Sequence, residues 1–216
     1  MKRLRRTIRY LYLLFCPILV LTVGLAIYFL PEPYRFFQDY LSELGAQLSV
    51  DNLFDNQISS VIFSVGFGLC ALISIIISIL YVASDFRYKY LKGSLNLIIA
   101  FGASLVAIPQ DKGNLLVLHT IGAALFVAAF GILNFTDQLL RFVRKRQEIP
   151  EEKKFDYYLD TTIVVVVFVV IFLLIIFFIP SEITKNPTLI LLSIIFQKLV
   201  LIVDCLALLV LDLDDI

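Results

Sequence analysis

The stretch Thr162–Ile179 reads TIVVVVFVVIFLLIIFFI, a run of branched aliphatic and aromatic side chains without a charged residue. An α-helix rises about 1.5 Å per residue, so roughly 20 such residues cross the ~30 Å hydrocarbon core of a bilayer. The chain holds five runs of spanning length and one borderline run, at Tyr10–Leu30, Ile58–Ala83, Leu91–Ile108, Leu115–Phe135, Thr162–Ile179 and Leu189–Leu211. This pattern predicts an integral membrane protein.

The composition indicates the same class of protein. Hydrophobic residues make up 60% of the chain and charged residues only 17%, whereas ordinary globular chains are about 45–50% apolar. Backbone groups in lipid must be hydrogen-bonded within their own element, so the runs are expected to be α-helices. We therefore predict an all-α, polytopic protein with six transmembrane helices that form a single domain over residues 1–216.

The basic residues gather in alternate connections between the apolar runs. The N-terminal tail and the second and fourth connections are rich in Lys and Arg, whereas the first, third and fifth hold only Arg35, Lys112 and Lys185. The positive-inside rule then places both termini in the cytoplasm of a multi-pass protein, which we expect in the cell membrane. Orientation accounts for the basic face, so no nucleic-acid partner is expected.

Small residues suggest how the helices pack. Gly122, Ala124, Ala128 and Gly131 leave little bulk on the fourth apolar run, and small residues let helices in lipid approach closely. We expect this helix at the centre of the bundle. The uniformly bulky fifth run is expected at the periphery.

The first connection, about Pro31–Gln57, carries a helical pattern. Its apolar residues recur at a spacing near 3.6, at Phe37, Tyr40, Leu41, Leu44 and Leu48. This pattern predicts a short amphipathic helix at the outer interface. The helix could seal the end of the bundle or act as a lid over an outer pocket.

The fourth connection, Asp137–Asp160, balances acidic against basic residues. Pro150 interrupts it, and proline cannot continue a helix interior without loss of a hydrogen bond. We expect an extension of the fourth helix followed by a solvated linker.

Charged residues stand inside the sixth apolar run. Lys198 lies near its middle, beside Gln197, and Asp204 follows. A charge at the bilayer centre costs about 2.5–3.5 kcal/mol on insertion scales and marks a functional site by default. A spacing of six residues sets Lys198 and Asp204 about 120° apart on a helix, so each needs its own partner. They could form structural pairs with other helices or line a cavity for an anionic headgroup or a proton-coupled group.

His119 is the single histidine of the chain. It could be a hydrogen-bonded packing element or a general base, since its ordinary pKa near 6.5 suits proton transfer. A catalytic arrangement of Ser42, His119 and Asp111 is conceivable, but no nucleophile elbow supports it. No metal site and no cofactor are expected, because the three cysteines all lie inside apolar runs.

Two segments resemble a known family. Asp39–Ala46 reads DYLSELGA and is followed by Asn52, Leu53, Phe54 and Asn56. This arrangement resembles the "ISxLGA…N…F(N)" segment of a six-helix group catalogued as domain of unknown function 998. Glu43 stands where Asp is common in that group.

The second segment is Gly102–Ala124, which includes Ile108-Pro109, Asp111 and the sequence HTIGA at His119–Ala123. It resembles the "G…G(I/L)FP…D…LHxxxA" segment of the same group, although Ala107-Ile108 replaces the usual Gly and aromatic residue. The resemblance spans about Tyr10–Leu211. It implies a six-helix bundle similar to the Frag/DRAM/Sfk membrane proteins, some of which act in lipid-anchor remodelling or regulate membrane lipid enzymes.

The topology brings the polar residues of these segments to the outer face. Asp39, Ser42, Glu43 and Asn56 would meet Asp111 and His119, with Lys198 approaching from below. We expect a lipid-binding protein that holds a headgroup near His119 and Lys198 and acts in membrane lipid homeostasis. The alternatives are a lipid hydrolase or acyltransferase that uses His119 with Asp111 or Glu43, and a small transporter or channel. Expected partners are membrane lipids, with a second copy or another membrane protein possible.

Overall fold

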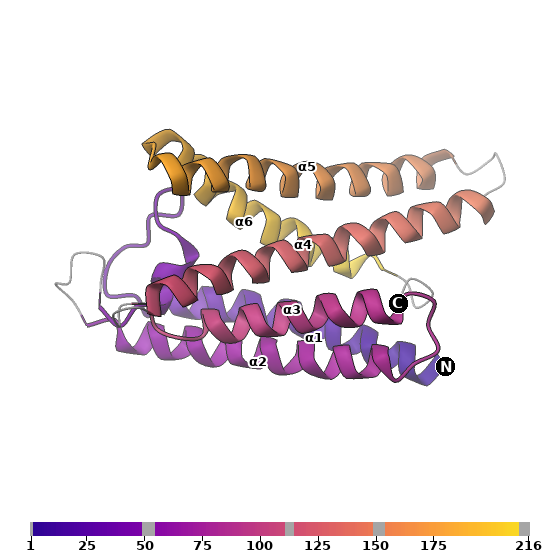
Figure 1. Cartoon of the computed structure of the whole chain (residues 1–216), viewed down its shortest axis with the longest axis horizontal. Helices are drawn as coiled ribbons and strands as arrows, with labels where there is room; N and C mark the ends of the chain where they lie inside the picture. Colours follow the sequence, from indigo (N-terminus) through magenta and orange to yellow (C-terminus); the bar gives the residue numbers. More distant parts are fainter. Residues whose placement is uncertain (1, 49–54, 111–114, 149–153, 212–216) are drawn as a thin grey trace. The chain divides into compact units, whose positions relative to one another are not determined.

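The computed structural model describes residues 2–48, 55–110, 115–148 and 154–211 (Figure 1). These residues form the helices α1 (Lys2–Tyr28), η1 (Leu41–Gly45), α2 (Gln57–Val82), α3 (Lys89–Val106), α4 (Leu115–Glu148), α5 (Lys154–Thr184) and α6 (Pro187–Leu209). Within the described ranges the only β interaction is an isolated antiparallel bridge between Leu48 and Asp55. The prediction of an all-α chain is confirmed.

Five of these helices are long and apolar enough to cross a membrane. They are α1, α2, α6 and the segments Leu115–Arg144 of α4 and Thr161–Thr184 of α5. The helix outside this set is α3, which has 18 residues and carries Lys89 and Lys92 in its first turn. Its crossing of the membrane stays a prediction.

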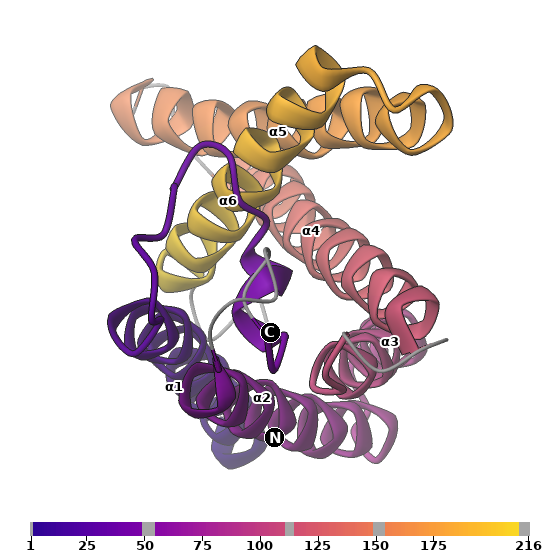
Figure 2. The same cartoon turned by 90° about the vertical axis from the view of Figure 1, so that its left-hand side faces the viewer.

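The chain divides into two compact units, which are described separately. The N-terminal unit is Tyr10–Ala129, and the C-terminal unit comprises Met1–Arg9 and Phe130–Ile216. In the first of them α2 and α3 lie side by side, as both views show (Figures 1 and 2). In the second, α6 crosses α5 obliquely (Figure 2).

Close helix approaches hold the N-terminal unit together. A Cβ at Gly102 would lie 2.5 Å from the backbone nitrogen of Phe126, so α3 and α4 meet almost backbone to backbone. The Ser78 hydroxyl donates to the Gly93 carbonyl at 2.8 Å and joins α2 to α3. The Asn96 amide donates to the Tyr12 hydroxyl at 2.8 Å and joins α3 to α1. Small and polar residues therefore set these contacts, as packing in lipid requires.

The C-terminal unit also packs through a glycine of α4. A Cβ at Gly131 would lie 2.8 Å from the Ile171 side chain of α5. The Gln138 amide donates to the Ala207 carbonyl of α6 at 2.7 Å. Asn186 caps α6 by accepting from the Thr188 backbone N–H at 2.9 Å.

Burial along the five helices that are long and apolar enough to cross a membrane agrees with one packing expectation and not with another. The most apolar window of α5 is 22% buried, the lowest share of the five, as expected for a peripheral helix. The corresponding window of α4 is 39% buried, whereas that of α2 reaches 50%. The helix that buries most of its apolar window is therefore α2 rather than α4.

Several element boundaries differ from the sequence predictions. The amphipathic α-helix expected in the first connection is instead the short 3₁₀ helix η1. The expected extension of the fourth helix is present, since α4 continues to Glu148, but Asp137 on this extension is fully buried. Pro180, which directly follows the apolar run Thr162–Ile179, lies inside α5. The connection 149–153, with Pro150, lies outside the described residues.

Candidate functional site: a polar pocket in the first loop

The first loop is fastened to the start of α2 by side chains that donate to its main chain. Ser60 donates its hydroxyl to the Gly45 carbonyl at 2.8 Å, and Ser59 donates to the Leu44 carbonyl at 3.2 Å. The Asn56 amide donates to the Ala46 carbonyl at 2.9 Å. Since a buried carbonyl without a partner is costly, these donors stabilise a 3₁₀ turn that is too short to satisfy itself.

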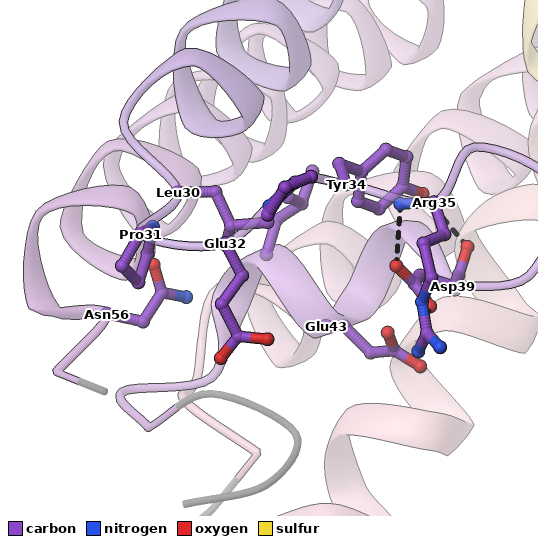
Figure 3. A pocket seen from close by; sticks show the side chains of 10 residues that line it. Leu30, Pro31, Glu32, Tyr34, Arg35, Asp39, Glu43 and Asn56 are labelled. Atoms are coloured by element: carbon purple, nitrogen blue, oxygen red, sulfur yellow. Dashed lines mark hydrogen bonds and ion pairs between the residues drawn. The ribbon is translucent and has the colours of Figure 1, made fainter. Parts of the chain in front are cut away.

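This loop encloses a small pocket (Figure 3). It is lined by Leu30, Pro31, Glu32, Pro33, Tyr34, Arg35, Asp39, Glu43, Leu44 and Asn56, all from the N-terminal unit. Its cavity volume is about 40 Å³, which holds roughly three water-sized groups. A whole lipid headgroup does not fit, but the end of one does.

The lining has an excess of negative charge. Among the described lining residues, three carboxylates face a single guanidinium, and that guanidinium pairs with Asp39 at 2.8 Å. The Arg35 backbone N–H also donates to the Asp39 carboxylate at 2.8 Å. Arg35 is exposed, so this ion pair adds little to stability, but the two contacts fix the orientation of the Asp39 carboxylate.

The pKa of Tyr34 is affected by the burial and the negative charge of the pocket. Its hydroxyl donates to the Asp39 backbone carbonyl at 2.9 Å. Burial raises the pKa of the Tyr34 phenol well above its ordinary value, and the nearby Glu43 and Asp39 carboxylates raise it further. Both causes disfavour the negatively charged phenolate form of Tyr34 beside the carboxylates.

His119 lies behind the loop, on α4. It is 1% exposed, and a Cβ added at Gly45 of η1 would lie 3.6 Å from its Cε1. Its Nδ1 lies 2.8 Å from the Ile108 carbonyl oxygen. A carbonyl can only accept, so Nδ1 carries the proton and the neutral ring has its lone pair on Nε2. The buried Nε2 has no hydrogen-bond partner among the described residues.

The other residues proposed for catalysis are only partly placed. Ser42 and Glu43 are half-buried on η1. Asp111 lies outside the described residues, so its expected approach to His119 stays a prediction. In the part of the chain that the structure describes, no group of three or more His, Cys, Asp or Glu side chains could hold a metal ion.

No family model, curated protein or solved structure matches this chain.

The remaining candidates belong to the C-terminal unit, on α6. Lys198 and Asp204 are buried, and Gln197 is half-buried. A Cβ at Gly131 of α4 would lie 3.5 Å from the Asp204 carboxylate, so Asp204 faces α4. Both Asp204 oxygens lack a hydrogen-bond partner among the described residues.

Sequence reasoning missed a buried polar stripe on α4 in the same unit. Its members share one helix face at spacings of three and four: Asn134, Asp137, Gln138 and Arg141. Residues from Asp137 onward were assigned to the fourth connection, so their burial was not expected. The signal that could have found them is the same spacing in the sequence after Phe130.

Proposed function

We propose that this chain is a six-span protein of the cell membrane, with cytoplasmic termini, that binds a membrane lipid through the pocket of its first loop. Five spanning helices support the membrane location. The alternation of basic connections supports the orientation and the sixth span. The resemblance to domain of unknown function 998 remains part of this proposal and implies a role in membrane lipid homeostasis.

The observation that carries the proposal is the position of the pocket at the N-terminal end of an apolar helix. Asn56 lines the pocket and directly precedes α2. Ile58, Val61 and Val65 follow at spacings of three and four, and all are more than half exposed. Acyl chains lying along these side chains would bring a headgroup to the level of the loop.

Exposed aromatic residues on the loop also support the proposal that the loop lies at the depth of the lipid headgroups. Phe36 and Phe37 are 45% and 62% exposed, and their rings contact each other at a centroid distance of 5.3 Å. Bulky aromatic side chains beside a polar loop suit the boundary between headgroups and acyl chains. The pocket would then lie where headgroups are.

A lipid hydrolase or acyltransferase is the second candidate. The observation that favours it is the His119 tautomer, in which the hydrogen bond to Ile108 leaves the Nε2 lone pair as a potential base. Its 1% exposure is the observation against it. Chemistry at this nitrogen would require the loop to open.

The test is lipid retention by native mass spectrometry after purification in mild detergent. Leu30→Trp places a large side chain in the pocket and should reduce retention of lipid of every class. Leu21→Trp is the matched control, because Leu21 is exposed on α1 and does not line the pocket. Equal retention by both variants would refute lipid binding at the pocket. Release of cleaved or acylated products from an ester-lipid panel would favour the enzyme instead.

A further inference from the structure

The charge of the pocket indicates the sign of its ligand. Glu32, Asp39 and Glu43 line it, and Arg35 supplies the single positive charge among the described lining residues. In the view of Figure 3, Glu32 lies between Asn56 and Glu43, while Arg35 stands beside Asp39 and Glu43. The Glu32 side of the pocket therefore has carboxylate charge without a guanidinium from the described lining beside it. An anionic group entering here would meet like charge.

Asn56 gives a second, independent indication. It is 2% exposed, and its amide orientation is fixed, since Nδ2 donates to the Ala46 carbonyl. Its Oδ1 has no hydrogen-bond partner among the described residues and does not cap α2, although Asn56 stands at the N-cap position. The carboxylate oxygen Oε1 of Glu32 is likewise buried without such a partner. The pocket thus presents buried acceptors that lack donors.

One chemical group satisfies both observations. A primary ammonium carries a positive charge and three N–H donors and has no acceptor. A quaternary ammonium has no N–H donor and is recognised by aromatic cages rather than by acceptors. The cavity of about 40 Å³ also suits a compact group with one or two waters.

We infer that the pocket of the first loop binds a primary amine, with Glu32 and Asn56 accepting its N–H donors. That the amine belongs to a lipid, as in an ethanolamine headgroup, rests on the proposed function. Free amine in solution is the other source with the same chemistry. This ligand is opposite in charge to the anionic headgroup expected from Lys198.

The experiment reconstitutes the full chain in nanodiscs of ethanolamine, choline or glycerol phospholipid and measures retained lipid by native mass spectrometry. The ethanolamine lipid should be retained over the other two. Glu32→Gln removes the charge but keeps an acceptor, and it should reduce this retention about tenfold, the usual cost of losing a charge-assisted hydrogen bond. Glu182→Gln is the control, because Glu182 is partly exposed, pairs with Lys185 at 2.7 Å and is not one of the residues that line the pocket.

A thermal melt with ethanolamine or methylamine, and no added lipid, distinguishes the sources of the amine. If no lipid of any class is retained, the proposed function fails. A melting shift that Glu32→Gln abolishes would then still support the amine site. If the glycerol lipid is preferred, or the choline lipid is retained equally, lipid binding stands and the amine inference is overturned. Retention that a chelator abolishes would assign the site to a metal ion and overturn it as well.

A melt without ligand checks that Glu32→Gln is folded. Should it be unfolded, Glu32→Ala replaces it, since Glu32 is half-buried and the smaller side chain removes both its charge and its acceptors. Retention unchanged in a folded variant of Glu32 contradicts the inference.

Discussion

Gly102 of α3 and Gly122 of α4 face each other so closely that a Cβ added to either would lie 2.9 Å from the carbonyl oxygen of the other. The relationship is reciprocal, so neither helix can carry a side chain at this crossing. In lipid, where apolar side chains gain nothing by leaving the solvent, such backbone proximity is a main source of helix association. It also holds α3, the least apolar candidate span, against its neighbour.

Gly122→Ala should therefore lower the stability of the protein in detergent. The added methyl would overlap Leu105 and the Gly102 carbonyl, and overpacking of this kind costs about 1–3 kcal/mol. Thermal melts give the measurement. Gly68→Ala on α2 is the matched control, because nothing lies within 4 Å of its added Cβ. It should be neutral or slightly stabilising, since alanine favours helix by up to about 1 kcal/mol over glycine.

Asp204→Asn should leave the melting temperature unchanged or raise it at neutral pH. Asp204 is 1% exposed with no hydrogen-bond partner for either oxygen among the described residues, so the substitution relieves an uncompensated buried acid. Asp39→Asn is the contrasting variant, because Asp39, unlike Asp204, has partners in the described part of the chain. Its carboxylate pairs with the Arg35 guanidinium and accepts from the Arg35 backbone N–H. A marked loss of stability in Asp204→Asn would reveal a partner that this acid depends on.

Tyr34 should make stability fall at alkaline pH. Its pKa is raised in the folded protein above the ordinary value of 10.0, so the neutral phenol is favoured by folding. The stability that this group contributes is complete below about pH 10 and is lost as pH rises toward the folded pKa. Melts of the wild type and Tyr34→Phe should diverge above about pH 10, with the wild type losing more. Parallel curves would contradict the buried, carboxylate-lined setting.

Cysteine accessibility tests the six-span topology. The native cysteines are all buried and are replaced first. Single cysteines at Phe37 and Gln110 should react with an impermeant thiol reagent from outside, whereas one at Asp85 should react only after permeabilisation. Reaction at Gln110 and Asp85 from the same side would show that α3 does not cross.

The helices could be predicted from the sequence because apolar runs of this length have no other stable form in lipid. The points at which the helices end were harder to predict. Asp137 and Gln138 are polar in sequence yet buried in the fold, so the continuation of α4 depends on partners such as the Ala207 carbonyl, far along the chain. The spacing of three and four in the sequence can place these residues on one helix face, but it does not identify a partner so far along the chain.

The site was predicted in part for the same reason. Asn56 and Asp39 were recognised as polar residues of the loop and do line the pocket. Glu32 and Tyr34 were missed, because beside Pro31 and Pro33 they carry no periodic signal. The helical spacing from Phe37 to Leu48 predicted an α-helix, but the carbonyls of residues 44–46 accept from side chains of α2 and of Asn56, just before it, instead of from their own turn. A contact between distant segments replaced the local one.

Ser59, Ser60 and Asn56 hold the first loop by its carbonyl oxygens, a group that every amino acid supplies. These three hydrogen bonds therefore do not require a particular side chain at the half-buried positions 42 and 43, whereas a Cβ at Gly45 would lie 2.8 Å from the Phe63 ring. Ser42 and Glu43 could be substituted without breaking the hydrogen bonds that hold the loop. Ligand preference can therefore change, by natural drift or by engineering, while the attachment of the loop stays the same.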